Sequence, residues 1–389
     1  MNCKDRKKFH NFAAKIWKIL FMKKYLLVIL FALCGTAAFA QLTKENDFGI
    51  NKLKLEFRTD FDCFSENSNL KSGFTGKYLN FIIAGDINDK LFYAYRQRIN
   101  KVQNMAQFFD ATDYLYLGWR ITDRISLTAG KEVIAMGGIE YDLAPIDVYF
   151  HSLFWDNFNC YRFGTNLVYT TKDESNIFTF QFTNSPYTSD IYDGLYNYSL
   201  HWRANFKHFS PVCSVNMYEY KKGSFLNVIA LGTGYKFGIL EGYLDFANRA
   251  HGEQESFFFK DITAIARIGL NFMNEDLQIY VKGGCDMNDA QPIDVHFAQI
   301  YDFTVLPGCD VKFYGGGFEY YPIRGRNDLR IHAFFAVSDV KRSMELVTIP
   351  VTGDDGQPTT IQVLNKNEDD CLSYQFNIGL TWRLNYLDK

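Results

Sequence analysis

The chain has 389 residues and a formal net charge of −3, and aromatic residues make up 17% of it. After the N-terminus it contains no run of about 18 uncharged apolar residues, which excludes a helical membrane protein. A high aromatic content without long apolar runs is typical of a membrane β-barrel, because apolar side chains there occupy alternate positions along each strand.

The N-terminus predicts export. Met22-Lys23-Lys24 forms a charged region, Tyr25–Leu33 an apolar core, and Ala38-Phe39-Ala40 a small-x-small cleavage site. We therefore expect residues 22–40 to be a signal peptide, residues 1–21 to be an extension before the true start at Met22, and residues 41–389 to be one outer-membrane barrel domain. The alternative is a lipoprotein anchored at Cys34, although Leu33 before it is not small. Cleavage after Ala40 would remove eight Lys/Arg and one Asp, leaving 33 basic and 43 acidic residues.

The mature chain predicts about sixteen strands, because apolar and polar side chains alternate with the period of two that strands require. The expected strands are 49–62, 74–87, 91–99, 114–120, 124–132, 160–171, 176–183, 195–207, 212–220, 225–236, 239–248, 262–272, 277–284, 311–321, 329–338 and 372–386.

The last strand shows the alternation most clearly. Its even positions from Leu372 to Tyr386 are large and apolar, and its odd positions are small or polar. Fifteen residues are long for a strand of a water-soluble protein, where about five or six are usual. One apolar and one polar face suit a strand between lipid and water, and we expect it to close the barrel against the first strand. A half-buried strand of a soluble, exported β-sandwich is the alternative.

Connection lengths support the same architecture. Short turns follow the even-numbered strands, and mostly longer loops follow the odd-numbered ones, namely 63–73, 100–112, 133–159, 184–194, 249–260, 285–309 and 339–370. Short periplasmic turns and long extracellular loops are the layout of outer-membrane barrels. Within the last loop, 344–351 and 359–364 predict a projecting hairpin.

The third long loop, 133–159, is unusually apolar and aromatic. Such a loop is expected to be buried, because large exposed apolar patches are rare. We predict that it folds into the lumen and narrows it; packing at a subunit interface is the alternative. It has no Lys or Arg but contains Glu140, Asp142, Asp147 and Asp156, so a constriction built from this loop would not be strongly phosphate-selective.

The polar faces of the strands lean basic although the chain is acidic. Odd or even position along each strand (parity) decides which face a side chain occupies. By parity the polar faces carry the cations Arg58, Arg96, Arg98, Arg120, Arg162, Arg203, Arg267, Lys282, Arg330 and Arg383. The acids on the same faces are fewer: Glu56, Asp60, Asp62, Asp86, Glu241 and Asp245. A lining of Arg and Lys favours anions, and the forked guanidinium group suits phosphate oxygens. The alternative is a mixed network that only stiffens the wall.

Catalytic and metal-binding motifs are missing from the sequence. It has no G-x-S-x-G, H-E-x-x-H, P-loop or C-x-x-C motif, and His201 on a polar face has no obvious Ser partner. We therefore expect no enzyme, no cofactor and no metal site. The acidic runs 286–289 and 368–370 could hold a divalent cation against lipopolysaccharide, with solvated acids as the alternative. Cys285 and Cys309 flank one loop and could pair, with isolated thiols as the alternative.

Four stretches resemble the phosphate-selective porin O and P family, in the form common in Bacteroidetes. They are Gly76-Lys77-Tyr78-Leu79-Asn80-Phe81, Tyr95-Arg96-Gln97-Arg98, Thr128-Ala129-Gly130-Lys131 and Tyr161-Arg162-Phe163-Gly164. The resemblance implies a sixteen-stranded barrel, usually trimeric, with its third loop inside and a constriction whose Arg and Lys attract phosphate. By position it implies Arg96, Arg98, Lys131 and Arg162 for that constriction.

The sequence thus predicts an outer-membrane porin for small hydrophilic solutes, with anions such as phosphate preferred. The expected pore-lining residues are Arg58, Arg96, Arg98, Arg120, Lys131, Arg162 and Arg203. Expected partners are those solutes, outer-membrane lipid and lipopolysaccharide, and two further copies in a homotrimer, with no nucleic acid. The alternative function is a surface-interaction barrel, an adhesin or scaffold, acting through its long loops.

Overall fold

The computed structural model describes residues 49–66, 69–102, 108–188, 192–252, 254, 256–289, 305, 307–324, 328–342, 344–352, 358–366 and 370–388. The expected signal peptide and the extension before it lie outside these residues. None of the helices in this part of the chain is long and apolar enough to cross a membrane.

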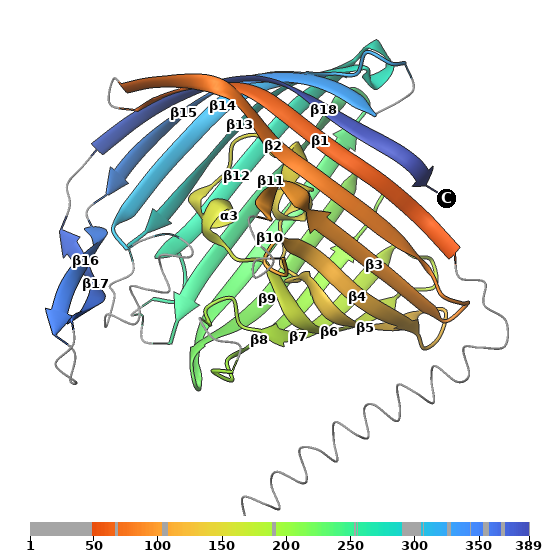
Figure 1. Ribbon diagram of the computed structural model, residues 1–389, viewed down its shortest axis with the longest axis horizontal. Helices are drawn as coiled ribbons and strands as arrows, with labels where there is room; N and C mark the ends of the chain where they lie inside the picture. Colours follow the sequence, from red (N-terminus) through yellow and green to blue (C-terminus); the bar gives the residue numbers. More distant parts are fainter. Residues whose placement is uncertain are drawn as a thin grey trace, which may run out of the picture. The chain divides into compact units, whose positions relative to one another are not determined.

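Sixteen antiparallel strands form one closed barrel, as the alternation predicts. Each strand pairs with its neighbours in sequence, and the last barrel strand closes on the first (Figure 1). The barrel strands are β1 (Gly49–Glu66), β2 (Asn69–Asp86), β3 (Leu91–Arg98), β4 (Thr112–Arg120), β5 (Ile125–Val133), β6 (Tyr161–Thr170), β7 (Asn176–Asn184), β8 (Tyr196–Ala204), β9 (Phe209–Lys221), β10 (Ser224–Phe237), β11 (Leu240–His251), β12 (Asp261–Phe272), β13 (Leu277–Asn288), β14 (Cys309–Tyr320), β15 (Leu329–Arg342) and β18 (Asp370–Asp388).

The two remaining strands, β16 (Met344–Thr352) and β17 (Pro358–Lys366), form a separate two-stranded sheet. They lie in the connection between β15 and β18, where the sequence predicts a hairpin. Figure 1 shows this hairpin projecting away from the barrel wall.

Short helical segments occupy three of the connections. The long connection between β5 and β6 contains α2 (Ile139–Asp142), η3 (Pro145–Asp147) and α3 (Leu153–Asn157). The 3-10 segments η1 (Ile99–Lys101) and η4 (Met273–Glu275) follow β3 and β12.

The alternation decides which face meets lipid. On β18, Leu372, Tyr374 and Phe376 are exposed on the outside, whereas Asn377 and Thr381 are each 1% exposed on the inside. The same division continues around the wall, because exposed Leu, Phe and Trp side chains alternate with buried polar ones. An apolar outer band around a polar interior is the arrangement that lipid requires of a spanning barrel.

The first long loop is the clearest difference from expectation. The sequence predicts a loop at 63–73, but β1 continues to Glu66 and β2 begins at Asn69. The reason is backbone pairing: Cys63 and Phe64 still face Phe376 and Gln375 of β18, so the ladder continues where the side-chain alternation has weakened.

The end of the chain is part of the barrel seam. Leu53 faces Leu387 and Lys54 faces Asn385, so Tyr386 is the extra residue of a β-bulge. Beyond the bulge, Asp388 still pairs with Lys52. The residues after Tyr386 therefore extend the last strand.

Candidate functional site: the interior of the barrel

The connection between β5 and β6, residues 134–160, crosses the inside of the barrel, and we call it the inner loop. Its two ends lie side by side, since Ile134 N–H donates to Cys160 O at 2.7 Å. Between them the chain makes hydrogen bonds to wall residues from β1 to β18. Figure 1 shows α3 lying within the ring of strands.

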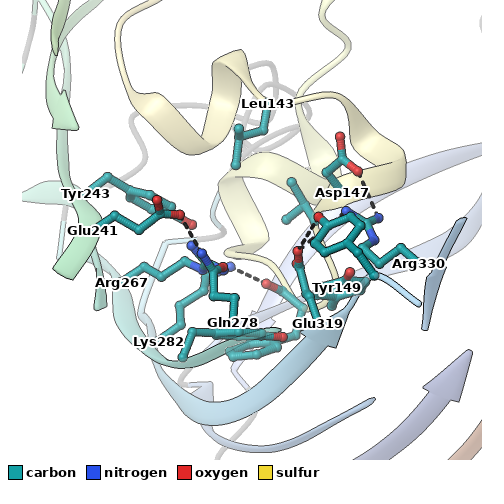
Figure 2. Close-up of a pocket in the computed structure, with 14 residues that line it drawn as sticks. Leu143, Asp147, Tyr149, Glu241, Tyr243, Arg267, Gln278, Lys282, Glu319 and Arg330 are labelled. Atoms are coloured by element: carbon teal, nitrogen blue, oxygen red, sulfur yellow. Dashed lines mark hydrogen bonds and ion pairs between the residues drawn. The ribbon is translucent and has the colours of Figure 1, made fainter. Parts of the chain in front are cut away.

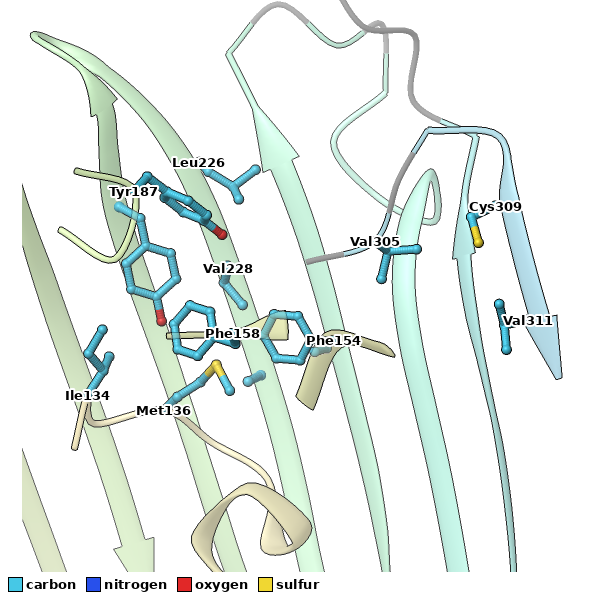
Figure 3. Packing of buried hydrophobic residues seen from close by; sticks show 13 residues of the cluster. Ile134, Met136, Phe154, Phe158, Tyr187, Leu226, Val228, Val305, Cys309 and Val311 are labelled. Carbon is cyan, nitrogen blue, oxygen red and sulfur yellow. The ribbon is translucent and has the colours of Figure 1, made fainter. Parts of the chain in front are cut away.

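The apolar residues of the inner loop pack against one side of the wall. Met136, Phe154 and Phe158 join a buried cluster with inward-facing wall residues that include Leu226 and Val228 (Figure 3). Burial of these side chains explains why so aromatic a segment occurs in a loop. The inner loop packs here because β10 carries apolar residues at three successive inward positions, Leu226, Val228 and Ala230.

Glycine lets the loop backbone touch the wall. A Cβ atom on Gly232 of β10 would lie 2.6 Å from Gly138 Cα and 2.5 Å from Asp245 Oδ1. Likewise, a Cβ on Gly137 would lie 2.5 Å from Ala230 O. These distances are below any normal contact, so the close approach requires glycine on both sides.

A Gly232→Ala substitution is therefore expected to push α2 off the wall. Overpacking of this kind costs about 1–3 kcal/mol, and it should lower the urea midpoint of the refolded barrel and raise its open-channel current noise. Gly234→Ala is the matched control on the same strand face, where the nearest atom to an added Cβ is Ile139 Cδ1 at 3.7 Å. Equal effects of the two substitutions would contradict a close loop–wall contact at Gly232.

Wall carboxylates hold the beginnings of both loop helices. Asp245 of β11 accepts the backbone N–H groups of Ile139 and Glu140 at 2.7 and 2.8 Å. Asp286 of β13 accepts the N–H of Leu153 at 2.7 Å. A carboxylate at a helix N-terminus satisfies amide groups that have no partner within the helix.

Wall cations, in turn, face the acids of the inner loop. Glu140 lies 2.6 Å from Lys282 Nζ, and Asp142 pairs with Arg203. Asp147 lies 2.8 Å from Arg330 and 2.5 Å from Arg383.

The environment of Asp147 shows the strength of this pairing. Burial alone would raise the pKa of the Asp147 carboxyl, but Arg330 and Arg383 hold that pKa below its ordinary value. Several cations that parity places inside are thus neutralised by the loop and do not form an open basic lining.

Two cavities adjoin each other between the inner loop and the wall of β2–β8. The cavity nearer the long loops, which we call the loop-side cavity, has a volume of about 470 Å³ and is lined by Arg98, Lys101 and the end of α3. The cavity nearer the short turns, which we call the turn-side cavity, has a volume of about 430 Å³ and is lined by Arg96, Glu132, His201 and Arg203. We name the residues that line both cavities the slot: they are Val133, Tyr141, Leu143, Pro145 and Tyr161.

Arg96 and Arg98 stand on either side of the slot and share one carboxylate. Arg96 Nε lies 3.1 Å from Asp113 Oδ2, and Arg98 Nε lies 2.6 Å from Asp113 Oδ1. Two guanidinium groups against one carboxylate leave one positive charge. Arg96 is 5% exposed, and its Nη2 atom is buried without a hydrogen-bond partner among the described residues, so Arg96 acts on an anion through its charge.

A third cavity, about 240 Å³, lies on the opposite side, between the inner loop and β11–β15. Figure 2 shows its charged residues arranged around an aromatic floor. Three cations, Arg267, Lys282 and Arg330, are balanced there by three acids, Asp147, Glu241 and Glu319. This side of the lumen therefore carries no excess charge.

The seven predicted pore-lining residues occupy different places. Arg96, Arg98 and Arg203 line the two adjoining cavities. Arg58 is 3% exposed and donates to the Ile146 and Val148 carbonyls, so it holds the inner loop. Arg120 pairs with Asp86 at 2.6 Å at the end of the barrel that carries the short turns.

Like Arg58 and Arg120, the last two predicted residues, Arg162 and Lys131, line none of these three cavities. Arg162 donates to Pro186 O at 2.7 Å and so supports the next loop. Lys131 shares ladder positions with Leu115 and Phe163, which are exposed on the outer face, and its ammonium group donates to Phe109 O. The physical reason is parity: in β5 the inward positions are Thr128 and Glu132.

Cys285, Cys309 and the acidic run 286–289 form neither the disulfide nor the cation site that the sequence allows. Cys285 faces Lys312 and Cys309 faces Asn288, so these two thiols occupy different rungs and form no disulfide. Asp286 is 0% exposed and holds α3, which leaves no open acidic run there for a bridging cation. Among the described residues, no group of three metal-ligating side chains occurs; residues 368 and 369 of the other acidic run lie outside them.

Sequence reasoning missed Asp113 and the slot. Asp113 sits where the β3–β4 register shifts, between Arg96–Tyr114 and Gln97–Thr112, and a bulge of this kind has no sequence signature here. The wall surface against which the inner loop packs could have been found from the sequence of β10. β10 alternates Leu226, Val228 and Ala230 inside with Ile229 and Leu231 outside, and an apolar inward face predicts that something covers it.

Solved structures confirm the fold. The chain is similar to an anion-selective porin from Comamonas acidovorans, with 9% sequence identity, a TM-score of 0.57, and coverage of 87% of this chain and 100% of that one. It is also similar to OmpT, an outer-membrane protein of Vibrio cholerae solved in a trimer form, with 13% identity, a TM-score of 0.52, and coverage of 87% and 99%. At these identities the likeness shows the fold alone.

Sequence comparison adds one match. No curated protein matches the chain. A family model described as phosphate-selective porin O and P matches residues 52–232, which include most of β1, all of β2–β9, the inner loop, and Arg96 and Arg98 beside the slot. The chain is therefore similar to porins in fold over its whole barrel, and to the porin O and P family in sequence over residues 52–232.

Proposed function

We propose that the protein is a porin of the bacterial outer membrane through which small hydrophilic solutes diffuse passively. The observation that carries this proposal is the pair of adjoining cavities beside the inner loop, inside a barrel with an apolar outer face. A loop that narrows the lumen without filling it suits selective diffusion. The porin folds and the family match support the same function.

We further propose that anions are preferred. The support is local: Arg96 and Arg98 share the single carboxylate of Asp113, and Lys101 lines the loop-side cavity near them. The acids Glu132, Asp142 and Asp156 also line the two cavities, so the preference depends on this cluster and not on an excess of cations in the lining. A univalent anion that passes Arg98 meets Arg96 about 7 Å further along, since the two lie on one strand face. The match to a family model described as phosphate-selective porin O and P also supports a preference for anions.

A channel is favoured over an enzyme on structural grounds as well. His201 has a cross-strand neighbour, Ser214, that sequence reasoning did not find. The Ser214 hydroxyl is already engaged, because it donates to Asn216 Oδ1 at 2.6 Å and accepts the N–H of Gly137 at 2.8 Å. It supports the inner loop, and it is not placed for nucleophilic attack.

The proposal has a direct test. Refolded mature protein added to a planar bilayer in potassium chloride should give discrete, uniform conductance steps, because each insertion opens the same pore. Steps in groups of three would support the proposed homotrimer. Folded barrel that inserts into lipid without any conductance would contradict the porin.

The alternative function, a surface-interaction barrel, rests on the β16–β17 hairpin, which forms its own sheet away from the wall. Deleting residues 344–366 separates the two functions. A porin should keep its conductance, whereas an adhesin or scaffold should lose partner binding while permeability stays the same.

A further inference from the structure

We infer that the slot selects organic anions that carry an apolar or planar face over strongly hydrated inorganic anions such as phosphate. This inference rests on the proposed function and names the solute class of the same pore. It depends on the chemistry of the five slot residues and on the position of the two arginines beside them.

The slot itself offers no charged group. All five residues that line both cavities are aliphatic or aromatic: Val133, Tyr141, Leu143, Pro145 and Tyr161. Charged residues lie in one cavity or the other but not at the junction. A solute that moves between the cavities must therefore pass an apolar edge.

Leu143 is the centre of this edge. It lines all three cavities described above, and it is 37% exposed although it is a leucine inside the barrel. Its place at the end of α2 explains the exposure, because the helix stops there and the backbone turns into an extended conformation. Figure 2 shows its side chain projecting from the inner loop.

The arginines approach the same edge together with aromatic rings. Arg98 Cζ lies 5.5 Å from the centre of the Tyr161 ring, and Arg96 Cζ lies 5.9 Å from the centre of the Tyr114 ring. The loop-side cavity adds Tyr78 and Trp155 to its lining. Cation and ring are thus presented side by side along the path.

This combination discriminates between anions by their hydration. An apolar edge cannot replace the hydrogen bonds that a small, strongly hydrated anion loses on leaving water, so such an ion pays a desolvation penalty in the slot. An aromatic carboxylate can place its ring against Leu143 and Tyr161 while its oxygens reach Arg98, the more exposed of the two arginines. Contact of the ring with the apolar slot residues buries apolar surface and so favours binding of the aromatic anion, whereas phosphate gains nothing from this contact.

Current block by three probes tests the inference on the complete refolded barrel. Benzoate, acetate and inorganic phosphate are each added to a bilayer that carries a chloride current, and the half-blocking concentration is measured. Benzoate should block at a concentration about tenfold below that of acetate, the ratio expected when part of one ring leaves water. Phosphate that blocks as well as benzoate would overturn the inference.

Two variants at one exposed position locate the effect. Leu143→Ser should raise the half-blocking concentration of benzoate several-fold and leave that of acetate unchanged, whereas Leu143→Phe should lower it. If benzoate blocks equally well in both variants, the slot does not recognise the apolar face of the anion. A conducting pore without benzoate preference refutes only this inference, whereas the absence of conductance refutes the porin itself.

Discussion

Excising residues 135–159 should raise the single-channel conductance several-fold. The cut is feasible because Ile134 N–H already donates to Cys160 O, so an Asn-Gly turn can join the two stems as a hairpin. Without the inner loop, a barrel of sixteen strands leaves an open aqueous channel. The measurement is the step size in a planar bilayer, with heat-modifiable migration on a gel as the check of folding.

The same excision carries a second expected result. It removes Glu140, Asp142 and Asp147, the acids that face Lys282, Arg203 and Arg330. The reversal potential in a salt gradient should therefore move further toward anions. Excising the hairpin 344–366 is the matched control and should leave both quantities unchanged. An excised barrel that folds but conducts no better would show that the inner loop does not obstruct the pore.

Substitutions at Arg98 and Asp113 should shift the reversal potential in opposite directions. Arg98→Gln leaves one guanidinium against one carboxylate, so anion preference should fall. Asp113→Asn leaves two cations without the acid they share, so anion preference should rise. One unit charge at 4 Å contributes about 1 kcal/mol in water, or about fivefold in the local concentration of a univalent anion.

Arg120→Gln is the matched control for this pair. Arg120 also pairs with a carboxylate, but its side chain is 42% exposed at the short-turn end, where water and salt screen it. It should change the reversal potential little. Shifts of the same sign from Arg98→Gln and Asp113→Asn would remove this cluster as the source of selectivity.

The strands could be predicted from the sequence because their period is simple and repeated. Leu372–Tyr386 shows it best, and its exposed and buried sides follow the alternation. Strand ends were less predictable, because backbone pairing continues after the alternation weakens, as at Cys63 and Phe64. Hydrogen bonds of the ladder do not depend on side-chain type.

The site was only partly predictable, for a different reason. Parity places Arg96 and Arg98 inside, and both line the path. It cannot show which inward cations are covered: Arg58 and Arg330 are buried against the inner loop, which approaches from elsewhere in the chain. The slot depends on how the loop folds back, and the residues that form it, such as Leu143, look ordinary in the sequence.

The seam between β1 and β18 has a consequence for assembly. Asn377 of β18 donates to Asp60 of β1 at 2.9 Å across a separation of 317 positions. Contacts this distant in the chain form late and slowly. Until they form, β1 and β18 are unpaired edges that lipid does not tolerate. Closure and insertion must therefore be coupled, and the polar contacts of Asn377 with Asp60 and Asp62 would then act as a register check on the final step of barrel biogenesis.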